Sequence, residues 1–358
     1  MRVLIVGCGY VGLPLAEHLA GQRHEVWGLR RSWSGVSGTA PSEIRRVSGD
    51  VTDPASLRGM PPAFDWVVNC VSAGGGDAAE YRRVYFDGTR HLLDWLSGAS
   101  SLRRYVYTSS TGVYPQNDGS EVDETSPVEP ASPTGRILVE TERLLLEAAG
   151  QRGFPAVILR LSGIYGPGRG YWLRQFLAGE ARLEGDGSRV LNMIHRDDVV
   201  GAIEVALERG RNGEIYNASD DEPVTQRVLF EWLAARTDRP APTALPAGGG
   251  GVGRETGCDE QTGTEPEAAP RPRLSPAFPD VPGGVCGGAR GARFVESSRT
   301  LRARVRAAES GVGAYASDPL AWWRRWRAVP GEWAAGGVAS RARHERTRSR
   351  GRRRTSVR

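Results

Sequence analysis

Short runs of β-branched and other apolar residues alternate with amphipathic stretches along the first two-thirds of the chain. Apolar side chains three or four residues apart mark one face of a helix, whereas short continuous apolar runs are typical of strands buried on both faces. This alternation predicts parallel strands joined by helices that cover the sheet. The predicted strands are Val3–Val6, Glu25–Leu29, Trp66–Cys70, Tyr105–Tyr107 and Ala156–Arg160, and the predicted helices are Leu13–Ala20, Tyr81–Leu96 and Glu140–Ala149.

The pattern changes at about Ala241, where Gly, Pro, Ala and Arg become frequent and no period is sustained. Such a composition is typical of linkers and disordered segments. We therefore expect an α/β domain over residues 1–240 and a disordered tail over residues 241–358. Read one base later with freely chosen codons, residues 258–284 would give an amphipathic helix and a strand-like segment. We hypothesise a frameshift after about Pro240, which the nucleotide sequence would test.

Charge is distributed unevenly between these two parts. Residues 1–240 hold 26 Arg and 31 acidic residues, whereas residues 241–358 hold 21 Arg and 11 acidic residues. The expected domain is therefore mildly acidic, and the basic excess of the tail alone predicts no specific nucleic-acid partner. All 47 basic residues are arginine, so the sequence contains no lysine.

The remaining composition narrows the class of protein. The 4 cysteines are widely spaced and show no metal-ligand pattern, which predicts no metal site and no disulfide framework. This cysteine usage is typical of a reducing cytoplasm. No apolar stretch reaches the ~20 residues of a membrane span. We expect a cytoplasmic protein that does not enter a membrane.

The first predicted strand leads directly into a glycine-rich turn, and the first predicted helix follows it. In a dinucleotide-binding turn the first glycine permits the tight turn, the second admits the pyrophosphate and the third lets helix and strand pack closely. The start of the helix then faces the phosphates. The alternative is a glycine-rich turn without a ligand. We predict that an NAD-type dinucleotide binds through Gly7, Cys8, Gly9, Tyr10, Val11 and Gly12, with Cys8 a small packed residue and not a nucleophile.

The second predicted strand is followed by basic residues where an acid would normally accept the ribose 2′-hydroxyl. Arg30 and Arg31 offer positive charge for a 2′-phosphate, which favours NADP over NAD. A solvated basic loop is the alternative, and NAD then remains as cofactor. Asp50 and Val51 are expected to bound the adenine pocket, and capping of a helix by Asp53 is an equally good explanation of that segment.

Four further motifs occur in order: TSSTGVY at residues 108–114, Glu124 with Pro127, RLSGIYGPGR at residues 160–169 and IHRDDV at residues 194–199. With the glycine turn, they resemble the extended and atypical short-chain dehydrogenase/reductase family, often labelled NAD-dependent epimerase/dehydratase. The resemblance covers residues 1–240 and implies a doubly wound parallel Rossmann sheet with a small C-terminal substrate-binding region at about residues 160–240. It also implies a nucleotide sugar or another small polar substrate.

The resemblance exposes a missing pair of residues. Active family members use Tyr-x-x-x-Lys, in which lysine holds the nicotinamide ribose and lowers the pKa of the tyrosine that acts as acid or base. Alignment on Gly135 and Glu142 places Thr134 at the tyrosine position and Leu138 at the lysine position. Because the chain has no lysine, no other alignment restores the pair. The chain resembles the atypical subgroup that keeps the cofactor motif and lacks the usual pair.

Four catalytic candidates remain. Ser110 matches the family's Ser/Thr that polarises the substrate, although a serine at a strand end also commonly satisfies backbone groups. Tyr114 and Tyr165, together with His195, are titratable groups that could replace the missing acid or base. The alternative for each tyrosine is a packing role.

The resemblance suggests further contacts around these candidates. Ser109 and Arg136 are expected to contact the cofactor, although an exposed arginine at a helix start would also explain Arg136. Arg169 and Arg196 are expected to bind an anionic group of a phosphorylated substrate. Asp197 and its neighbour Asp198 are expected to cap a helix rather than to form a catalytic dyad.

These features lead to two hypotheses. The first is an NADP-preferring oxidoreductase or epimerase-like enzyme in which Ser110 polarises a small-molecule substrate and a non-standard residue moves the proton. The alternative is a catalytically inactive NAD(P)-binding sensor or scaffold. A homodimer is left open, and substrate and reaction direction are not predicted.

Overall fold

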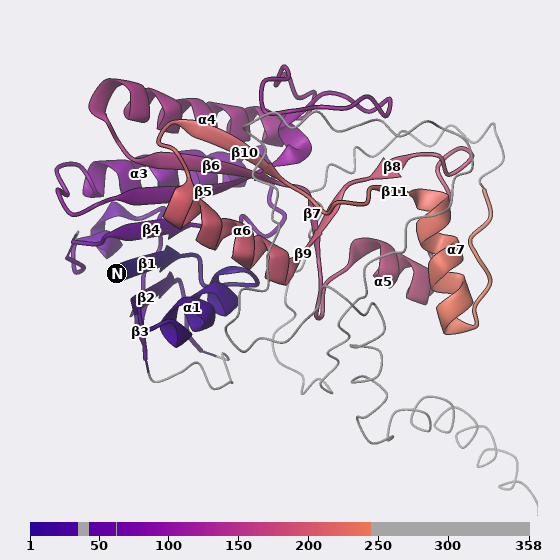
Figure 1. Ribbon diagram of the computed structural model, residues 1–358, viewed down its shortest axis with the longest axis horizontal. Helices are drawn as coiled ribbons and strands as arrows, with labels where there is room; N and C mark the ends of the chain where they lie inside the picture. Colours follow the sequence, from indigo (N-terminus) through magenta and orange to yellow (C-terminus); the bar gives the residue numbers. More distant parts are fainter. Residues whose placement is uncertain (35–42, 62, 245–358) are drawn as a thin grey trace, which may run out of the picture. The chain divides into compact units, whose positions relative to one another are not determined.

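The computed structural model describes residues 1–34, 43–61 and 63–244, and the expected tail beyond them lies outside the described residues (Figure 1). The strands are β1 (Arg2–Val6), β2 (Glu25–Arg30), β3 (Ile44–Ser48), β4 (Trp66–Asn69), β5 (Arg104–Ser110), β6 (Ala156–Leu161), β7 (Gly163–Tyr165), β8 (Val190–Leu191), β9 (Met193–His195), β10 (Glu214–Ala218) and β11 (Val224–Thr225). The helices are α1 (Gly12–Gly21), α2 (Ala78–Tyr81), α3 (Gly88–Trp95), α4 (Pro133–Arg152), α5 (Tyr171–Ala178), α6 (Arg196–Arg209) and α7 (Gln226–Thr237). Two 3₁₀ turns, η1 (Pro54–Leu57) and η3 (Thr111–Val113), and one π-helical stretch, η2 (Arg82–Asp87), complete the described elements.

A seven-stranded sheet in the order β10-β6-β5-β4-β1-β2-β3 forms the centre of the fold. All of its neighbouring strands run parallel. The strand order reverses between β1 and β4, and in such sheets a ligand binds outside the carboxyl ends of the strands at that point. The predicted doubly wound Rossmann sheet is therefore confirmed.

Helices cover both faces of this sheet (Figure 1). On β1, Val3 and Ile5 point into the core that α1 and α6 cover, and Leu4 and Val6 point into the core under α3 and α4. Successive side chains of a strand face opposite sides, so an uninterrupted apolar run fits a strand that is buried on both faces. This explains why the sequence pattern identified β1.

The predicted elements are all present, with shifted ends. The five predicted strands correspond to β1, β2, β4, β5 and β6, and β5 continues to Ser110 instead of ending at Tyr107. The predicted helix from Tyr81 becomes α2, η2 and α3. Helix α4 begins at Pro133, well before the predicted start at Glu140, because the Ser132 hydroxyl accepts the Gly135 N–H at 3.1 Å and caps it.

A second, smaller core lies in the region predicted to bind substrate. Phe176 of α5 and Phe230 of α7 stack there, with Leu191 and Val224 of the paired strands β8 and β11. The predicted substrate-binding region does not form one separate unit. Between its elements the chain returns to the main sheet, where α6 packs on one face and β10 forms an edge strand. Among the residues that the structure describes, no helix has the length and apolar character to cross a membrane.

Candidate active site

The carboxyl ends of the central strands open into a cavity of about 420 Å³. Its walls come from the glycine turn, the ends of β2, β4, β5 and β6, and η2. Of the predicted site residues, those that line it are Gly7, Cys8, Gly9, Tyr10, Val11, Arg30, Arg31, Asp50, Val51, Ser109, Ser110 and Arg169. Gly12, Tyr114, Arg136 and Tyr165 are not among its lining residues.

The three glycines of the turn have three different environments. Gly7 has φ 95°, and a Cβ there would lie 2.7 Å from the carbonyl oxygen of Cys70. A Cβ on Gly12 would lie 2.2 Å from the carbonyl oxygen of Gly7, so this glycine brings helix and turn together. A Cβ on Gly9 would meet nothing within 4 Å. Gly7 and Gly12 therefore shape the turn, and Gly9 leaves space on its cavity side.

This space fits the diphosphate of a dinucleotide. Helix α1 starts at Gly12 directly behind the turn, and no side chain caps its first N–H groups. The Leu13 N–H already donates to the Gly9 carbonyl oxygen at 3.1 Å and Pro14 has no N–H, so the helix dipole is what favours an anion at this position. The space at Gly9 is where a diphosphate would approach the backbone.

The thiol of Cys8 contributes packing and not chemistry. The side chain is fully buried, and burial raises the pKa of the Cys8 thiol to about 12. A thiol with so high a pKa is a poor nucleophile, since the thiolate is the reactive form. Cys8 thus borders the cavity mainly through its backbone, as predicted for a small packed residue.

Two arginines stand at the end of β2 with different surroundings. The Arg30 guanidinium donates to the carbonyl oxygen of Cys8 at 3.2 Å and lies 5.5 Å from the ring centroid of Trp33. Arg31 is exposed and lines the cavity. Both arginines line the cavity, where Arg31 is exposed and Arg30 is hydrogen-bonded to the turn.

The acidic segment after β3 contributes to the cavity wall and to a helix cap. Asp50 lines the cavity, and its carboxylate accepts the Thr52 N–H at 2.9 Å. Asp53 accepts the Ala55 N–H at 2.9 Å and caps η1 ahead of Pro54, so the capping explanation is confirmed for this residue.

Ser110 lies in the cavity wall at the end of β5. Its hydroxyl oxygen accepts the Gly112 N–H at 3.0 Å, so the serine satisfies a backbone group as the alternative interpretation held. A hydroxyl that accepts one hydrogen bond still has its own hydrogen to donate. Leu138 also lines the cavity and is only 2% exposed, so the cavity wall includes a buried apolar side chain.

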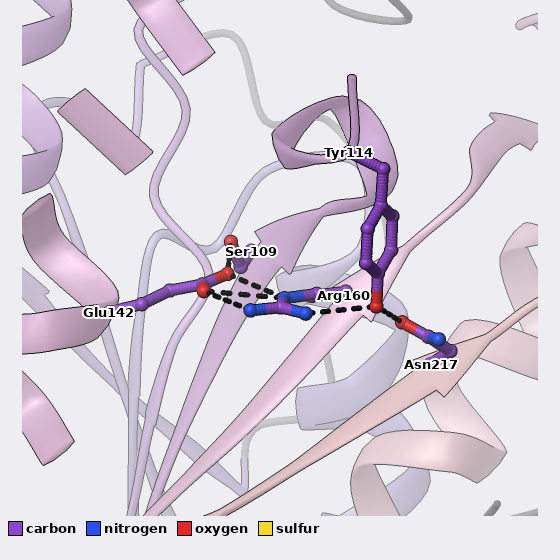
Figure 2. Close-up of polar contacts among 5 residues, drawn as sticks. All are labelled: Ser109, Tyr114, Glu142, Arg160 and Asn217. Atoms are coloured by element: carbon purple, nitrogen blue, oxygen red, sulfur yellow. Dashed lines mark hydrogen bonds and ion pairs between the residues drawn. The ribbon is translucent and has the colours of Figure 1, made fainter. Parts of the chain in front are cut away.

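Tyr114 does not line the cavity, and its hydroxyl is hydrogen-bonded within the protein. Its hydroxyl donates to Asn217 Oδ1 at 2.8 Å and accepts from an Arg160 guanidinium nitrogen at 2.9 Å (Figure 2). Burial raises the pKa of the Tyr114 hydroxyl, and the nearby Arg160 only partly opposes this effect. The predicted acid or base role does not agree with this geometry, because the proton of Tyr114 is committed to Asn217.

Arg160 continues this network toward the cavity. Both oxygens of the Glu142 carboxylate accept hydrogen bonds from the Arg160 guanidinium, the shortest at 2.7 Å. Ser109 donates to the same carboxylate at 2.6 Å (Figure 2). Ser109 borders the cavity, but its hydroxyl is used within the protein. Five residues, from β5, α4, β6, β10 and the position directly after η3, thus form one polar chain, in which Ser109, Glu142 and Arg160 are buried.

Two further candidates lie beside each other on the pair of strands β7 and β9. The rings of Tyr165 and His195 meet edge to face with centroids 5.3 Å apart, and neither residue is among those lining the cavity. His195 Nδ1 accepts the Asp197 N–H at 3.2 Å and caps α6. The prediction that the two aspartates cap this helix is therefore wrong, and both instead occupy its first turn, where negative charge complements the helix dipole.

Three arginines predicted as ligand contacts lie at the start of α4, at the start of α6 and in the turn after β7. Arg136 is exposed, and its guanidinium donates to the carbonyl oxygen of Ala131, so the alternative of an exposed helix-start arginine describes it. Arg196 pairs with Asp197 at 2.8 Å and is not among the cavity's lining residues. Arg169 does line the cavity.

Tyr85 is a titratable cavity residue that the sequence analysis did not identify. It lies on η2, lines the cavity and packs against the small apolar cluster of Val113, Leu138 and Val139. Its spacing of four residues from Tyr81 places both rings on one face of the helix, with centroids 5.0 Å apart. That repeated aromatic spacing was the available signal.

A doubly wound parallel sheet with an open glycine turn at its switch point defines a dinucleotide-binding Rossmann protein. The profile of the NAD dependent epimerase/dehydratase family matches residues 3–219, and the chain belongs to this family. The resemblance seen in the sequence motifs is thereby confirmed.

Three relatives illustrate the relationship. Protein YeeZ of Escherichia coli K12 is 32% identical over 238 residues, which cover 65% of this chain and 82% of YeeZ. The 3-diazoavenalumate denitrifying reductase of a Streptomyces species is 30% identical over 268 residues, covering 69% of this chain and 85% of the reductase. A solved structure from Methylobacillus flagellatus, provisionally described as an NAD-dependent epimerase/dehydratase, is 34% identical with a TM-score of 0.57, and the match covers 68% of this chain and 84% of that one.

Proposed function

We propose that this chain is an NADP(H)-dependent oxidoreductase or epimerase-like enzyme that acts on a nucleotide sugar or another small polar substrate without the Tyr-x-x-x-Lys pair. The observation that carries the proposal is one cavity lined by both the open glycine turn and Ser110. This arrangement would place a cofactor and a polarised substrate oxygen in the same space. The reductase among the relatives supports hydride chemistry in a similar chain.

Each residue around the cavity would have a separate role in the reaction. A bound nicotinamide would supply or accept a hydride. Ser110 would donate its hydroxyl hydrogen to the substrate oxygen, because accepting the Gly112 N–H leaves that hydrogen for a donor bond. Tyr85 would take the proton-transfer role predicted for Tyr114 and Tyr165, because it lines the cavity and those two do not. Leu138 would exclude water from the cavity wall.

The cofactor preference rests on the charge at the end of β2. Because Arg31 is exposed in the cavity wall, Arg31→Ala should weaken NADPH binding about tenfold or more and leave NADH binding nearly unchanged. Nucleotide fluorescence and the ligand-induced shift in melting temperature measure both affinities. Arg136→Ala serves as a control, since that exposed arginine does not border the cavity. Equal loss for the two cofactors would refute the assignment of the 2′-phosphate to Arg31.

Catalysis is tested by turnover. Purified protein with NADPH or NADP⁺ is screened against nucleotide sugars and small ketones and alcohols. If a substrate is found, Ser110→Ala and Tyr85→Phe should lower kcat, and Tyr114→Phe should lower it much less in protein that remains folded. The opposite ranking of the two tyrosine variants would return the proton-transfer role to Tyr114.

A specific observation favours a second candidate function. The alignment places the apolar residue Leu138, which lines the cavity, at the position of the lysine. It places Thr134 at the position of the tyrosine, and the Thr134 hydroxyl donates to the Ser132 hydroxyl at the start of α4. A protein that keeps the cofactor turn and has given up catalysis would be a cofactor-binding sensor or scaffold. Saturable NADPH binding without turnover in the screen supports this function, and turnover refutes it.

A further inference from the structure

The turn formed by residues 166–169 points a cationic side chain at the glycine turn. Backbone hydrogen bonds of 3.0 Å link Gly166 and Arg169 in both directions. Pro167 stands second in this turn, and Gly168 stands third with φ 72°. Proline followed by a glycine of positive φ is the pattern of a type II turn, which holds the residue after it in a fixed place. The 166–169 turn therefore holds the backbone of Arg169 in a fixed position.

The aromatic ring of Tyr10 supports this arginine. The Arg169 guanidinium carbon lies 4.8 Å from the centroid of the Tyr10 ring, and both residues line the cavity. The Tyr10 hydroxyl lies against Gly166, where a Cβ would come within 2.9 Å of it. Because Tyr10 belongs to the glycine turn itself, the two turns contact each other through this ring. A guanidinium held over an aromatic face is pre-organised at little further cost in side-chain entropy.

The position of Arg169 in the sheet indicates which part of a dinucleotide it would meet. The adenine end of the cavity is formed by Arg31 and Asp50, after β2 and β3. Arg169 follows β7, which comes directly after β6 on the other side of the switch point. The half of a doubly wound sheet beyond that point holds the second nucleotide. Arg169 thus lies on the side of the cavity where a bound dinucleotide would have its nicotinamide half.

We propose that Arg169, held over Tyr10 by the 166–169 turn, binds the nicotinamide-side phosphate of the cofactor's diphosphate. This inference rests on the proposed function, since it concerns the same cofactor. It gives the site a fixed cation in a chain that has no lysine. Bidentate binding of a phosphate by a guanidinium also fixes its orientation.

A neighbouring arginine provides the matched control. The Arg196 guanidinium carbon lies 5.5 Å from the same Tyr10 centroid, yet this side chain pairs with Asp197 and is not among the cavity's lining residues. The two arginines therefore share the aromatic contact and differ in their access to the cavity. Loss of Arg196 removes a similar charge from the region without removing a phosphate ligand.

The experiment compares the wild-type protein with Arg169→Ala, Arg169→Lys and Arg196→Ala. Each is titrated with NADPH, NADH, ADP and AMP, and melting curves without ligand verify folding. We expect Arg169→Ala to weaken NADPH, NADH and ADP by a similar factor of about ten or more, because the diphosphate is common to all three. AMP binding should be unchanged, Arg169→Lys should recover part of the loss, and Arg196→Ala should stay within about twofold of wild type.

Three outcomes would overturn the proposal. Affinity of Arg169→Ala within twofold of wild type, an equal loss in Arg196→Ala, or an equal loss for AMP and ADP would each exclude a diphosphate clamp. Failure of the wild-type protein to bind either dinucleotide is a different result, because it refutes the proposed function and the clamp together.

Discussion

Glu142 and Arg160 place a full pair of charges in the core, with side chains 2% and 3% exposed. Removing two ions from water is costly, and the pair is tolerated because the guanidinium and the carboxylate satisfy one another in a bidentate arrangement. Ser109 and Tyr114 use the remaining hydrogen-bonding capacity of the pair (Figure 2). Breaking one partner leaves the other charge buried and unpaired.

This gives a prediction for stability. Glu142→Gln should lower the free energy of unfolding by about 3 kcal/mol or more, because Arg160 loses its counter-charge in a buried site. Glu140→Gln is the control on the same helix, since Glu140 and its partner Arg82 are 41% and 45% exposed. That change should cost less than about 1 kcal/mol. Urea unfolding measures both variants. An equal loss in the free energy of unfolding for the two would show that the buried pair does not stabilise the fold more than the exposed pair does.

Two substitutions in the glycine turn should distinguish effects on stability from effects on cofactor binding. Gly9→Ala should keep the free energy of unfolding within about 1 kcal/mol of wild type, because its Cβ would meet open space, yet should weaken NADPH binding. Gly7→Ala should cost about 2 kcal/mol or more, because it combines strained φ with a clash against Cys70. Denaturant melts and NADPH titrations of both variants test this. NADPH affinity of Gly9→Ala equal to that of wild type would argue against phosphate binding at the turn.

The residues of the cofactor turn could be read from sequence because they are consecutive, and their spacing carries the geometry. The assignment of Tyr114 as an acid or base could not be tested in the same way. Its partners Arg160 and Asn217 lie 46 and 103 residues away in sequence and meet only in the folded sheet. A motif identifies residue types, whereas the partners that occupy a hydroxyl depend on tertiary structure.

At the scale of elements, the five strands predicted from apolar runs are the interior strands of the sheet, and the two unpredicted strands, β3 and β10, are its edges. Interior strands are buried on both faces and have continuous apolar runs. Edge strands carry exposed polar residues, as Arg45 and Arg46 of β3 show. The pattern that identifies strands therefore weakens at the edges of the sheet, which limits prediction there for a physical reason.

Helix α4 extends further than its apolar period because its first turns depend on a cap. Ser132→Ala should destabilise the protein by about 1 kcal/mol, since the Gly135 N–H loses its acceptor. Ser132→Asp retains a capping oxygen and should restore most of this loss. Thermal melts of the two variants test the cap, and equal melting temperatures for Ser132→Ala and wild type would show that Pro133 alone sets the helix start.

At the scale of the whole molecule, the described residues contain the main cores on the two faces of the sheet and a separate small core between α5 and α7. Phe230→Ala removes a ring that is 1% exposed in the small core and should cost about 3 kcal/mol. Because that core is separate, we expect faster hydrogen exchange in α5 and α7 and unchanged protection in the sheet.

Phe64→Ala is the matched change in a main core, where the ring is fully buried. It should lower protection throughout the sheet and weaken NADPH binding. If Phe230→Ala lowers protection in β1 and β4 to the same extent, the two regions unfold as one unit and the separation is wrong.

The order of the strands also has a consequence for biosynthesis. Strand β10 pairs with β6 at the edge of the sheet, and it is the last of the seven strands to leave the ribosome. All six residues of β6 are buried in the folded protein. A nascent chain that stalls before Glu214 would therefore present β6 as an unpaired apolar edge, which is a template for aggregation. We expect chaperones that hold nascent chains to engage this protein until β10 has emerged.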